Sequence, residues 1–332
     1  MLKLQDWVQL DKMDWLKLSF NPNAIYLLEK YPDKIHLDQL SSNSNAIQLL
    51  EKNLDKLSEL SWYYLSSNPN AIPLLEKHPD KINWVELSSN PNAISLLENH
   101  YDKLFDSCWY YLSSNPNAIP LLEKHPDKID WSYLSANPNA IPLLEKNLDK
   151  IHWGMLSGNP NAIPLLEKHP DKIHWVYLSR NPNAIHLLEK NSNKIHWANL
   201  SLNPNAMSLL EKHPNKIHWS NLSSNPNAMP LLEKYPDKIH WITLSGNLNA
   251  IALLEKYPDK IDWFWLSRNP NAMPLLVKYP ENIDWIWISS NPVIFTYDYQ
   301  FIAERCCLLK RDLMKNRFHP RHLDQLEHWG FL

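Results

Sequence analysis

Residues 82–98 read INWVELSSNPNAISLLE, and this stretch contains the pattern that decides the fold. Its skeleton, I-x-W-x-x-L-S-x-N-P-N-A-I-x-L-L-E-K-x-P-D-K, recurs from near the first residue to about residue 292. A period of about 20–50 residues is typical of a solenoid, in which stacked units bury one continuous core. The spacing here is 22 residues, and 25 residues twice, between the first asparagines of successive turns: Asn21, Asn43, Asn68, Asn90, Asn115, Asn137, Asn159, Asn181, Asn203, Asn225, Asn247, Asn269 and Asn291.

Each unit is predicted to form two short helices. Trp84, Leu87 and Ser88 stand at i, i+3 and i+4 and therefore share one helix face. Asn83 occupies the N-cap position of this first helix. Asn-Pro ends it, because a residue before proline avoids the α region. The L-L-E-K half of the unit forms the second helix.

Proline places the start of the second helix. Proline has no backbone N–H, so within a helix it belongs in the first turn. We therefore predict that the second Asn of N-P-N-A, as in Asn70, Asn117 and Asn139, caps this helix. The prolines that carry this inference are Pro73, Pro120, Pro142, Pro164, Pro230 and Pro274.

The predicted fold class is an all-α solenoid of about 12–13 two-helix repeats with a helical C-terminal cap. Residues 1–20 form an N-terminal cap and half repeat, residues 21–290 the solenoid, and residues 291–332 the C-terminal cap. With helices packed about 8–10 Å apart, thirteen units predict a rod or superhelix roughly 100–130 Å long. A leucine-rich-repeat-like solenoid is the alternative, since its period overlaps.

The C-terminal segment differs in kind from the repeats. The stretch from Phe295 to about Asn316 has no Gly or Pro and predicts one long amphipathic helix. A short helix over residues 321–328 follows, and together they are interpreted as the cap of the last unit. His319, His322, His328, Asp324 and Glu327 lie densely here without the spacing of a metal site.

Composition narrows the function classes. The formal net charge is −3, which gives no general attraction to nucleic acid or anionic membranes. Three cysteines, two of them adjacent, make no disulfide framework. The N-terminal residues lack the apolar region of a signal peptide, and no run of about 20 apolar residues follows. We expect an intracellular protein that is not secreted.

The repeat motif, followed by Tyr297-Asp298-Tyr299 and by F-H-P-R-x-L at 318–323, resembles a repeat family of giant DNA viruses that infect algae and amoebae. The resemblance covers nearly the whole chain and implies a virus-encoded protein of the infected-host cytoplasm or the virion. It brings no activity, cofactor or functional residue with it. The chain departs from the motif at Leu37, Ser44, Leu248 and Val277.

Candidate chemistry is sparse. Five histidines precede the repeat Trp, but other units place Asp, Asn or Ser there, which indicates helix capping instead of metal binding. The repeat tryptophans share a face with Leu, so we expect them to pack in the core. No G-x-S-x-G, G-x-G-x-x-G or H-E-x-x-H motif occurs. We predict no catalytic, cofactor or metal site. The histidines are His152, His174, His196, His218 and His240.

The variable positions of the first helix are the candidate partner-binding residues. At about 100° per residue, the second residue after Trp and the residue before Asn-Pro point away from the core. A constant scaffold with variable Tyr, Trp and Arg is typical of protein recognition. The candidates are Tyr64, Glu86, Tyr111, Tyr133, Met155, Tyr177, Arg180, Asn199, Asn221, Thr243, Trp265, Arg268 and Trp287.

The sequence thus favours a non-catalytic scaffold that binds a host or viral protein, without a membrane. One alternative is a structural component of the virion or its assembly, for which a repeat array would act as a spacer. Another is a single-stranded RNA reader with one nucleotide per unit. The balanced charge makes nucleic acid the weaker hypothesis, since phosphate contacts need unpaired Lys and Arg.

Overall fold

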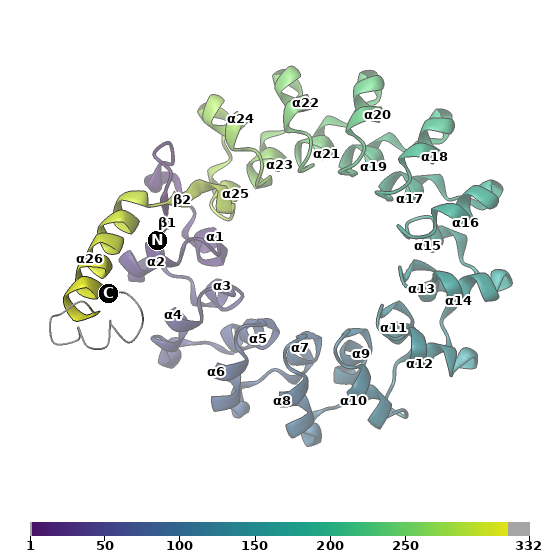
Figure 1. Ribbon diagram of the computed structural model, residues 1–332, viewed down its shortest axis with the longest axis horizontal. Coiled ribbons are helices and arrows are strands. Elements are labelled where there is room, and N and C mark those ends of the chain that lie inside the picture. Colours follow the sequence, from purple (N-terminus) through teal and green to yellow (C-terminus); the bar gives the residue numbers. More distant parts are fainter. Residues whose placement is uncertain (1, 318–332) are drawn as a thin grey trace, which may run out of the picture.

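The computed structural model describes residues 2–317, with side chains to residue 311, and its helices form a closed ring around a central hole (Figure 1). In this part of the chain, thirteen helices form the inner row of the ring. They are α1 (Trp15–Phe20), α3 (Leu37–Ser41), α5 (Glu59–Ser67), α7 (Trp84–Ser89), α9 (Asp106–Ser114), α11 (Trp131–Ala136), α13 (Trp153–Gly158), α15 (Trp175–Leu178), α17 (Trp197–Leu202), α19 (Trp219–Ser224), α21 (Trp241–Ser245), α23 (Trp263–Arg268) and α25 (Trp285–Ile288).

The second helix of each unit lies on the outside of the ring (Figure 1). The described residues contain twelve of these: α2 (Ile25–Lys30), α4 (Ile47–Glu51), α6 (Ile72–Lys77), α8 (Ile94–Asn99), α10 (Ile119–Lys124), α12 (Ile141–Glu145), α14 (Ile163–Lys168), α16 (Ile185–Lys190), α18 (Met207–Lys212), α20 (Met229–Lys234), α22 (Ile251–Lys256) and α24 (Met273–Lys278). The all-α solenoid of two-helix repeats is confirmed. The leucine-rich-repeat alternative is wrong, because the residues before each Asn form helices.

The predicted N-cap is correct for the inner helices such as α7 and wrong for the outer helices such as α6. Asn83 caps α7, since its Oδ1 accepts a hydrogen bond from the Glu86 amide at 3.0 Å. Pro73 lies in the first turn of α6, as expected. The prediction that Asn70 caps α6 is wrong, because the N-cap is Ala71, without a side-chain hydrogen bond.

The second asparagines of the turns bind between units instead. The Asn70 Nδ2 donates to the Ser44 carbonyl oxygen of the preceding unit at 3.0 Å. Asn117 and Asn139 likewise donate to the carbonyls of Pro91 and Pro116, so neither caps its helix. The side chain of the second asparagine therefore forms a hydrogen bond between units and does not cap the helix that follows it.

The core lies between the two rows of helices. Leu87 and Ala93 of one unit are wholly buried, as are their equivalents around the ring. Ten of the repeat tryptophans pack against this core while keeping one edge partly exposed, and Trp62 and Trp109 are buried. In seven of these ten units the Trp ring lies against an aromatic residue sixteen positions later, as in Trp84 and His100, whose ring centroids are 5.3 Å apart. The expectation of core packing holds.

A ladder of buried asparagines joins all the units. Asn137 donates through Nδ2 to the carbonyls of Ser113 and Asn115 in the preceding unit, at 3.1 and 3.0 Å. Its Oδ1 accepts from the Asn139 amide at 3.0 Å and so holds the N-P-N-A turn. All thirteen asparagines that open the turns are buried and make the same three bonds.

The ladder continues across the junction between the last and first units, which we name the seam (α25 and α1). The Asn21 Nδ2 donates to the carbonyls of Ser289 and Asn291, each at 3.0 Å. The Asp14 amide donates to the Ser289 Oγ at 2.9 Å, as the Asp130 amide does to the Ser113 Oγ. The seam is therefore bonded like an ordinary boundary between units. The predicted rod or superhelix, roughly 100–130 Å long, is wrong, because the two end faces of the array cover each other.

A two-stranded clasp strengthens the seam. Strand β1 (Leu2–Leu4) pairs antiparallel with β2 (Phe295–Tyr297), with Lys3 opposite Thr296. Helix α26 (Tyr299–Arg317) follows and lies outside the ring (Figure 1). The predicted single helix from Phe295 is thus a strand followed by a helix. The predicted short helix and the histidines at 319, 322 and 328 lie outside the described residues.

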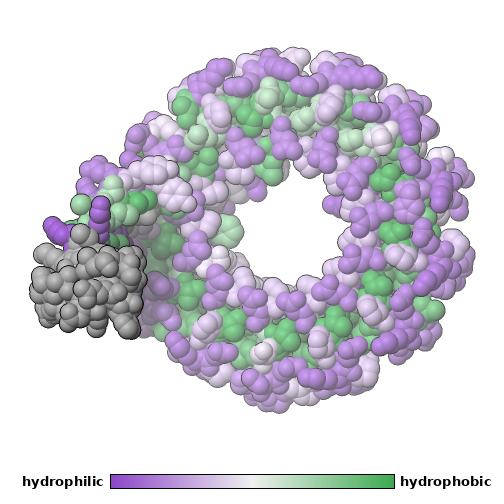
Figure 2. All heavy atoms as spheres, viewed as in Figure 1, coloured by the Kyte–Doolittle hydropathy of each residue, from purple (hydrophilic) through white to green (hydrophobic). Residues whose placement is uncertain are grey.

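Side chains do not fill the centre of the ring, as the space-filling view shows (Figure 2). Thirteen inner helices spaced about 8–10 Å apart would form a circle roughly 35–40 Å across at their axes. Subtracting helices about 10 Å thick leaves a hole roughly 25 Å wide. That width exceeds the diameter of a single helix.

Removal of one buried asparagine side chain is the first test of the ladder. Asn137→Ala leaves the Ser113 carbonyl and the Asn139 amide without partners and removes one of the two bonds of the Asn115 carbonyl, so the free energy of unfolding should fall by about 2–4 kcal/mol. Asn139→Ala, which removes one exposed bond, is the matched control and should cost below about 1 kcal/mol. Urea unfolding followed by circular dichroism measures both. Equal losses would refute the role assigned to the buried side chain.

The same substitution at the seam tests ring closure. In a closed ring Asn21→Ala should destabilise as much as Asn137→Ala, within about 1 kcal/mol, because both asparagines make the same three bonds. In an open array Asn21 would have no preceding unit, and its loss would cost little. Urea unfolding, with electron microscopy of the unmodified protein to show the hole, makes this comparison.

Candidate functional site

The exposed side of the inner helices forms the wall of the hole. On each inner helix the third and fourth residues after the repeat Trp, such as Leu134 and Ser135, are buried against the rest of the unit. The first, second and fifth residues lie on the opposite side, which faces the hole because this row of helices lines it (Figure 1). We name these the wall positions, counted from Leu37 in α3, where Leu replaces Trp.

All thirteen candidate residues predicted from the sequence occupy wall positions. Those with exposed side chains are Tyr111, Tyr133, Tyr177, Arg180, Trp265 and Arg268. Those that are partly buried between neighbouring helices are Tyr64, Glu86, Met155, Asn199, Asn221, Thr243 and Trp287. The candidates therefore share one continuous surface, although they come from eleven different units.

Three of the partly buried candidates bind the preceding unit. The Nδ2 atoms of Asn199 and Asn221 donate to the carbonyls of Val176 and Ala198, each at 2.8 Å. Thr243 continues this short ladder, with its Oγ1 3.2 Å from the Ser220 carbonyl oxygen. These polar side chains are already used in the scaffold, so this part of the wall offers a partner less than its sequence indicates.

The exposed tyrosines of the wall lie on the helices from α5 to α15, and we name this part of the wall the tyrosine arc. Tyr110 and Tyr133 of adjacent units stack with their ring centroids 6.2 Å apart. Tyr177 is exposed beside His174, at 4.8 Å between ring centroids. Five residues after Trp, the units of Tyr110 and Tyr133 carry the small residues Ser114 and Ala136, whereas the unit of Tyr177 carries Arg180. The arc presents rigid amphipathic rings to the hole.

The wall carries few charges. Of its 39 positions, five are charged: Lys17, Asp38, Glu86, Arg180 and Arg268. In contrast, the outer helices carry lysine–glutamate pairs from unit to unit, such as Lys124 and Glu98 at 2.8 Å. Tyr, Ser and Trp have near-neutral hydropathy, and the wall accordingly shows mixed pale and hydrophilic colours in the space-filling view (Figure 2).

Both carboxylates of the wall have neighbours from an adjacent unit: Asp38 accepts hydrogen bonds from the Ser58 and Ser61 hydroxyls, and Glu86 interacts with Tyr63. Glu86, in the unit after Tyr63, favours the neutral Tyr63 hydroxyl as a hydrogen-bond donor, and its negative charge disfavours the phenolate. Both effects raise the pKa of Tyr63 above its ordinary value of 10.0. Glu86 is therefore part of a tyrosine–carboxylate pair.

Several wall residues escaped sequence reasoning. The first residue after Trp, about 100° around the helix, is exposed in many units, as in Tyr63, Tyr110, Ile242, Phe264 and Ile286. The repeated Tyr-Tyr at residues 63–64 and 110–111 was the signal that pointed to this position. Phe20, five residues after Trp15, is also exposed, although the half repeat in residues 1–20 contributed no candidate residue.

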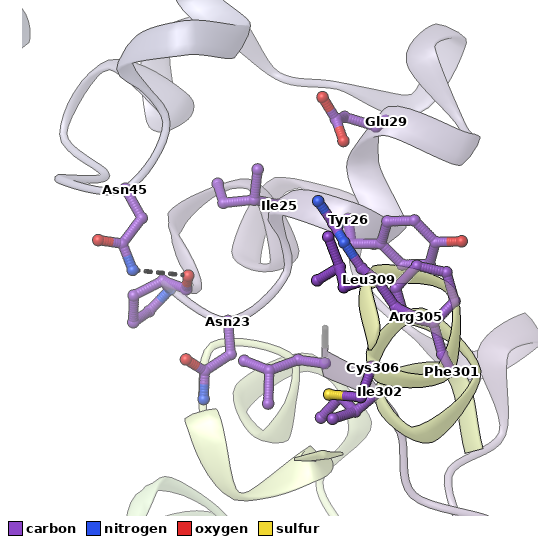
Figure 3. A pocket seen from close by; sticks show the side chains of 12 residues that line it. Asn23, Ile25, Tyr26, Glu29, Asn45, Phe301, Ile302, Arg305, Cys306 and Leu309 are labelled. Atoms are coloured by element: carbon purple, nitrogen blue, oxygen red, sulfur yellow. Dashed lines mark hydrogen bonds between the residues drawn. The ribbon is translucent and has the colours of Figure 1, made fainter. Parts of the chain in front are cut away.

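A cavity outside the ring was also beyond sequence reasoning. It measures about 560 Å³ and lies between α2 and α26, where Ile25 and Tyr26 face Phe301 and Ile302 (Figure 3). Arg305 extends from α26 toward α2 in the same view (Figure 3). No local pattern predicts this cavity, because ring closure brings together residues nearly 280 positions apart.

The histidines before the repeat Trp act mainly as caps. The Nδ1 of His152 accepts a hydrogen bond from the Met155 amide at 3.1 Å, and His196, His218 and His240 make the equivalent contact. Within the described residues, no three His, Cys, Asp or Glu side chains are grouped as a metal ion would require. None of the helices described has both the length and the apolarity needed to cross a bilayer.

The tyrosine–carboxylate pair predicts a pH effect. Because the pKa of Tyr63 is raised in the folded ring, the stabilisation from this pair is fully present below pH 10 and is lost as pH rises through the folded pKa. Glu86→Gln should return the Tyr63 titration toward pH 10. Alkaline difference absorbance, with Tyr63→Phe as the reference that removes this signal, measures the shift. An unchanged titration would contradict the pairing.

Comparisons with protein-family models, with curated protein sequences and with solved structures returned no match to this chain.

Proposed function

We propose that this protein is a non-catalytic ring scaffold that binds another protein, of host or viral origin, on the wall of its hole. The observation that carries the proposal is the composition of the wall, where Tyr, Ser, Asn and Gly surround a few Trp and Arg. This mixture is typical of adaptable protein-recognition surfaces, in which aromatic anchors provide area and small polar residues provide hydrogen bonds.

The scaffold supports this function by holding the wall rigid. Each inner helix is bonded to both neighbours through the asparagine ladder, and the ladder has no free end. Side chains presented by a rigid frame lose less conformational entropy when a partner binds, so more of the contact energy appears as affinity. Repetition thus provides the frame, and the variable wall positions provide the specificity.

The distribution of charge favours protein over RNA as the partner. Three of the 39 wall positions are cationic and two are acidic, so phosphate groups would find few unpaired cations. The hypothesis of a virion spacer assumed an array whose length increases with the number of repeats. A closed ring is not such an array, so this argument no longer supports a role in the virion. A ring-shaped recognition scaffold agrees with both observations.

Alanine substitutions in the tyrosine arc test the proposal. The triple variant Tyr111→Ala, Tyr133→Ala, Tyr177→Ala should lose the proteins that co-purify with the tagged ring, because the exposed rings provide the contact area. Its thermal midpoint should stay within about 3 °C, since exposed side chains contribute little to stability. Affinity purification followed by mass spectrometry, with thermal unfolding by circular dichroism, gives both results.

A matched triple variant on the outer helices controls for nonspecific loss. Glu123→Ala, Lys146→Ala and Lys190→Ala remove exposed side chains from the same sector, and should leave the captured proteins unchanged. Retention of those proteins by the tyrosine variant would exclude this arc as the binding surface. A large fall in its thermal midpoint would instead assign the tyrosines to the scaffold.

A further inference from the structure

The wall around the seam differs from the rest of the ring in exposing large apolar side chains. The exposed fractions are 49% for Ile242, 40% for Trp265, 54% for Ile286 and 49% for Phe20. These residues lie on α21, α23, α25 and α1, four consecutive helices of the inner row (Figure 1). We name these residues, together with Phe264 and Trp287, the seam patch. Contiguous exposed apolar surface of this kind marks a binding site.

Two cations stand over one ring of the seam patch. The Arg268 Cζ lies 4.3 Å from the centroid of the Trp287 ring, and the Lys17 Nζ lies 4.2 Å from it. Arg268 comes from the unit before Trp287 and Lys17 from the unit after it, across the seam. Ring closure alone brings these three side chains together.

Neither cation has an acidic partner in the described part of the chain, where no carboxylate oxygen lies within 4.0 Å of Arg268 or Lys17. Lysines on the outer helices, by contrast, pair with glutamates of the preceding unit, as Lys256 does with Glu233 at 2.8 Å. The seam patch thus combines apolar surface with positive charge that the ring does not neutralise. A guanidinium in this setting binds a carboxylate through two parallel hydrogen bonds.

A small pocket adjoins this cluster. It measures about 280 Å³ and is lined by Thr243, Gly246 and Trp265 together with Ser224 and Asn247. Gly246 lies at the wall position five residues after Trp241. The equivalent residue two units earlier is Leu202. A Cβ at Gly246 would lie 3.6 Å from Trp265, an ordinary contact, so glycine leaves the pocket open without any backbone requirement. One large apolar side chain of a partner fits a space of this size and lining.

We propose that the seam patch is the anchor site of the ring, and that it binds an acidic protein segment carrying one large apolar residue. The apolar residue enters the pocket beside Trp265, and neighbouring carboxylates pair with Arg268 and Lys17. This inference rests on the proposed function and deepens it, because it names the chemistry of the partner. It also separates the wall into an anchoring arc at the seam and an adaptable tyrosine arc opposite.

Two features favour a protein segment over a nucleic acid at this site. Phe20 and Ile286 present aliphatic and phenyl surface to the hole beside the cations, and charged phosphates would be desolvated against it without compensation. Two of the three wall cations lie in this one cluster and the third, Arg180, is in the unit of α15, whereas a strand of nucleic acid needs cations along its whole track.

Selection from a random twelve-residue peptide library displayed on phage, with the intact ring immobilised, tests the proposal. Peptides enriched on the wild-type ring should carry Asp or Glu beside Leu, Phe or Trp more often than the starting library. A chosen enriched peptide should bind Arg268→Gln with Lys17→Gln at least tenfold more weakly, because its carboxylates lose both partners. Fluorescence polarisation of the labelled peptide measures the affinity.

A second pair of variants controls for charge. Lys34→Gln with Lys190→Gln removes the same charge from exposed positions outside the wall, and should leave the peptide affinity within twofold. Gly246→Leu should fill the pocket and also weaken binding at least tenfold. We expect the Gly246→Leu variant to fold, because Leu202 already occupies the equivalent position of α17. An unchanged thermal midpoint of this variant would verify it.

The outcomes separate this inference from the proposed function. Enriched peptides that are no more acidic than the library, or that bind the seam variants as well as wild type, overturn the seam site. If those peptides are lost with the tyrosine triple variant, the ring still binds protein and only the seam assignment fails. Enrichment of no peptide overturns both. Binding of a random single-stranded RNA probe that requires Arg268 and Lys17 would replace the protein segment with nucleic acid.

Discussion

The buried asparagine at the start of each N-P-N-A turn is the interaction on which the ring depends. A buried amide needs partners for both its donors and its acceptor, since an unsatisfied polar group costs about 1–3 kcal/mol. Asn137 meets this need by spanning two carbonyls of the preceding unit and one amide of its own turn. Apolar packing alone would let neighbouring units slide, whereas these directional bonds define one geometry at every boundary.

That geometry, repeated thirteen times, closes the chain on itself. Closure of thirteen units requires a mean rotation of about 28° per unit, a value within the small per-repeat rotations that curve solenoids. The last unit then meets the first in the bonding register of every other pair, and β1 and β2 join the two ends. An open solenoid must cover two apolar end faces, and this ring has none.

Ring closure also explains where a distinctive binding site can arise on a repetitive scaffold. A repeated unit offers the same groups everywhere, so a distinctive site arises only where side chains vary or where the chain ends meet. Trp287 receives Arg268 from one side of the seam and Lys17 from the other, a combination that no pair of consecutive repeats contains. The tyrosine arc is built from consecutive units, whereas the seam brings together residues from opposite ends of the chain.

The sequence by itself determined the period, the two helices of each unit, the inner-helix caps such as Asn83, and the prolines of the first turns, because these depend on contacts within a few residues. Only the tertiary structure decided that Asn70 binds the preceding unit instead of capping α6, since its partner lies 26 residues away. The same holds for the ring. Small rotations accumulate over thirteen units, and no local pattern contains their sum, so closure, the hole and the contact of Lys17 with Trp287 emerge only from the assembled chain.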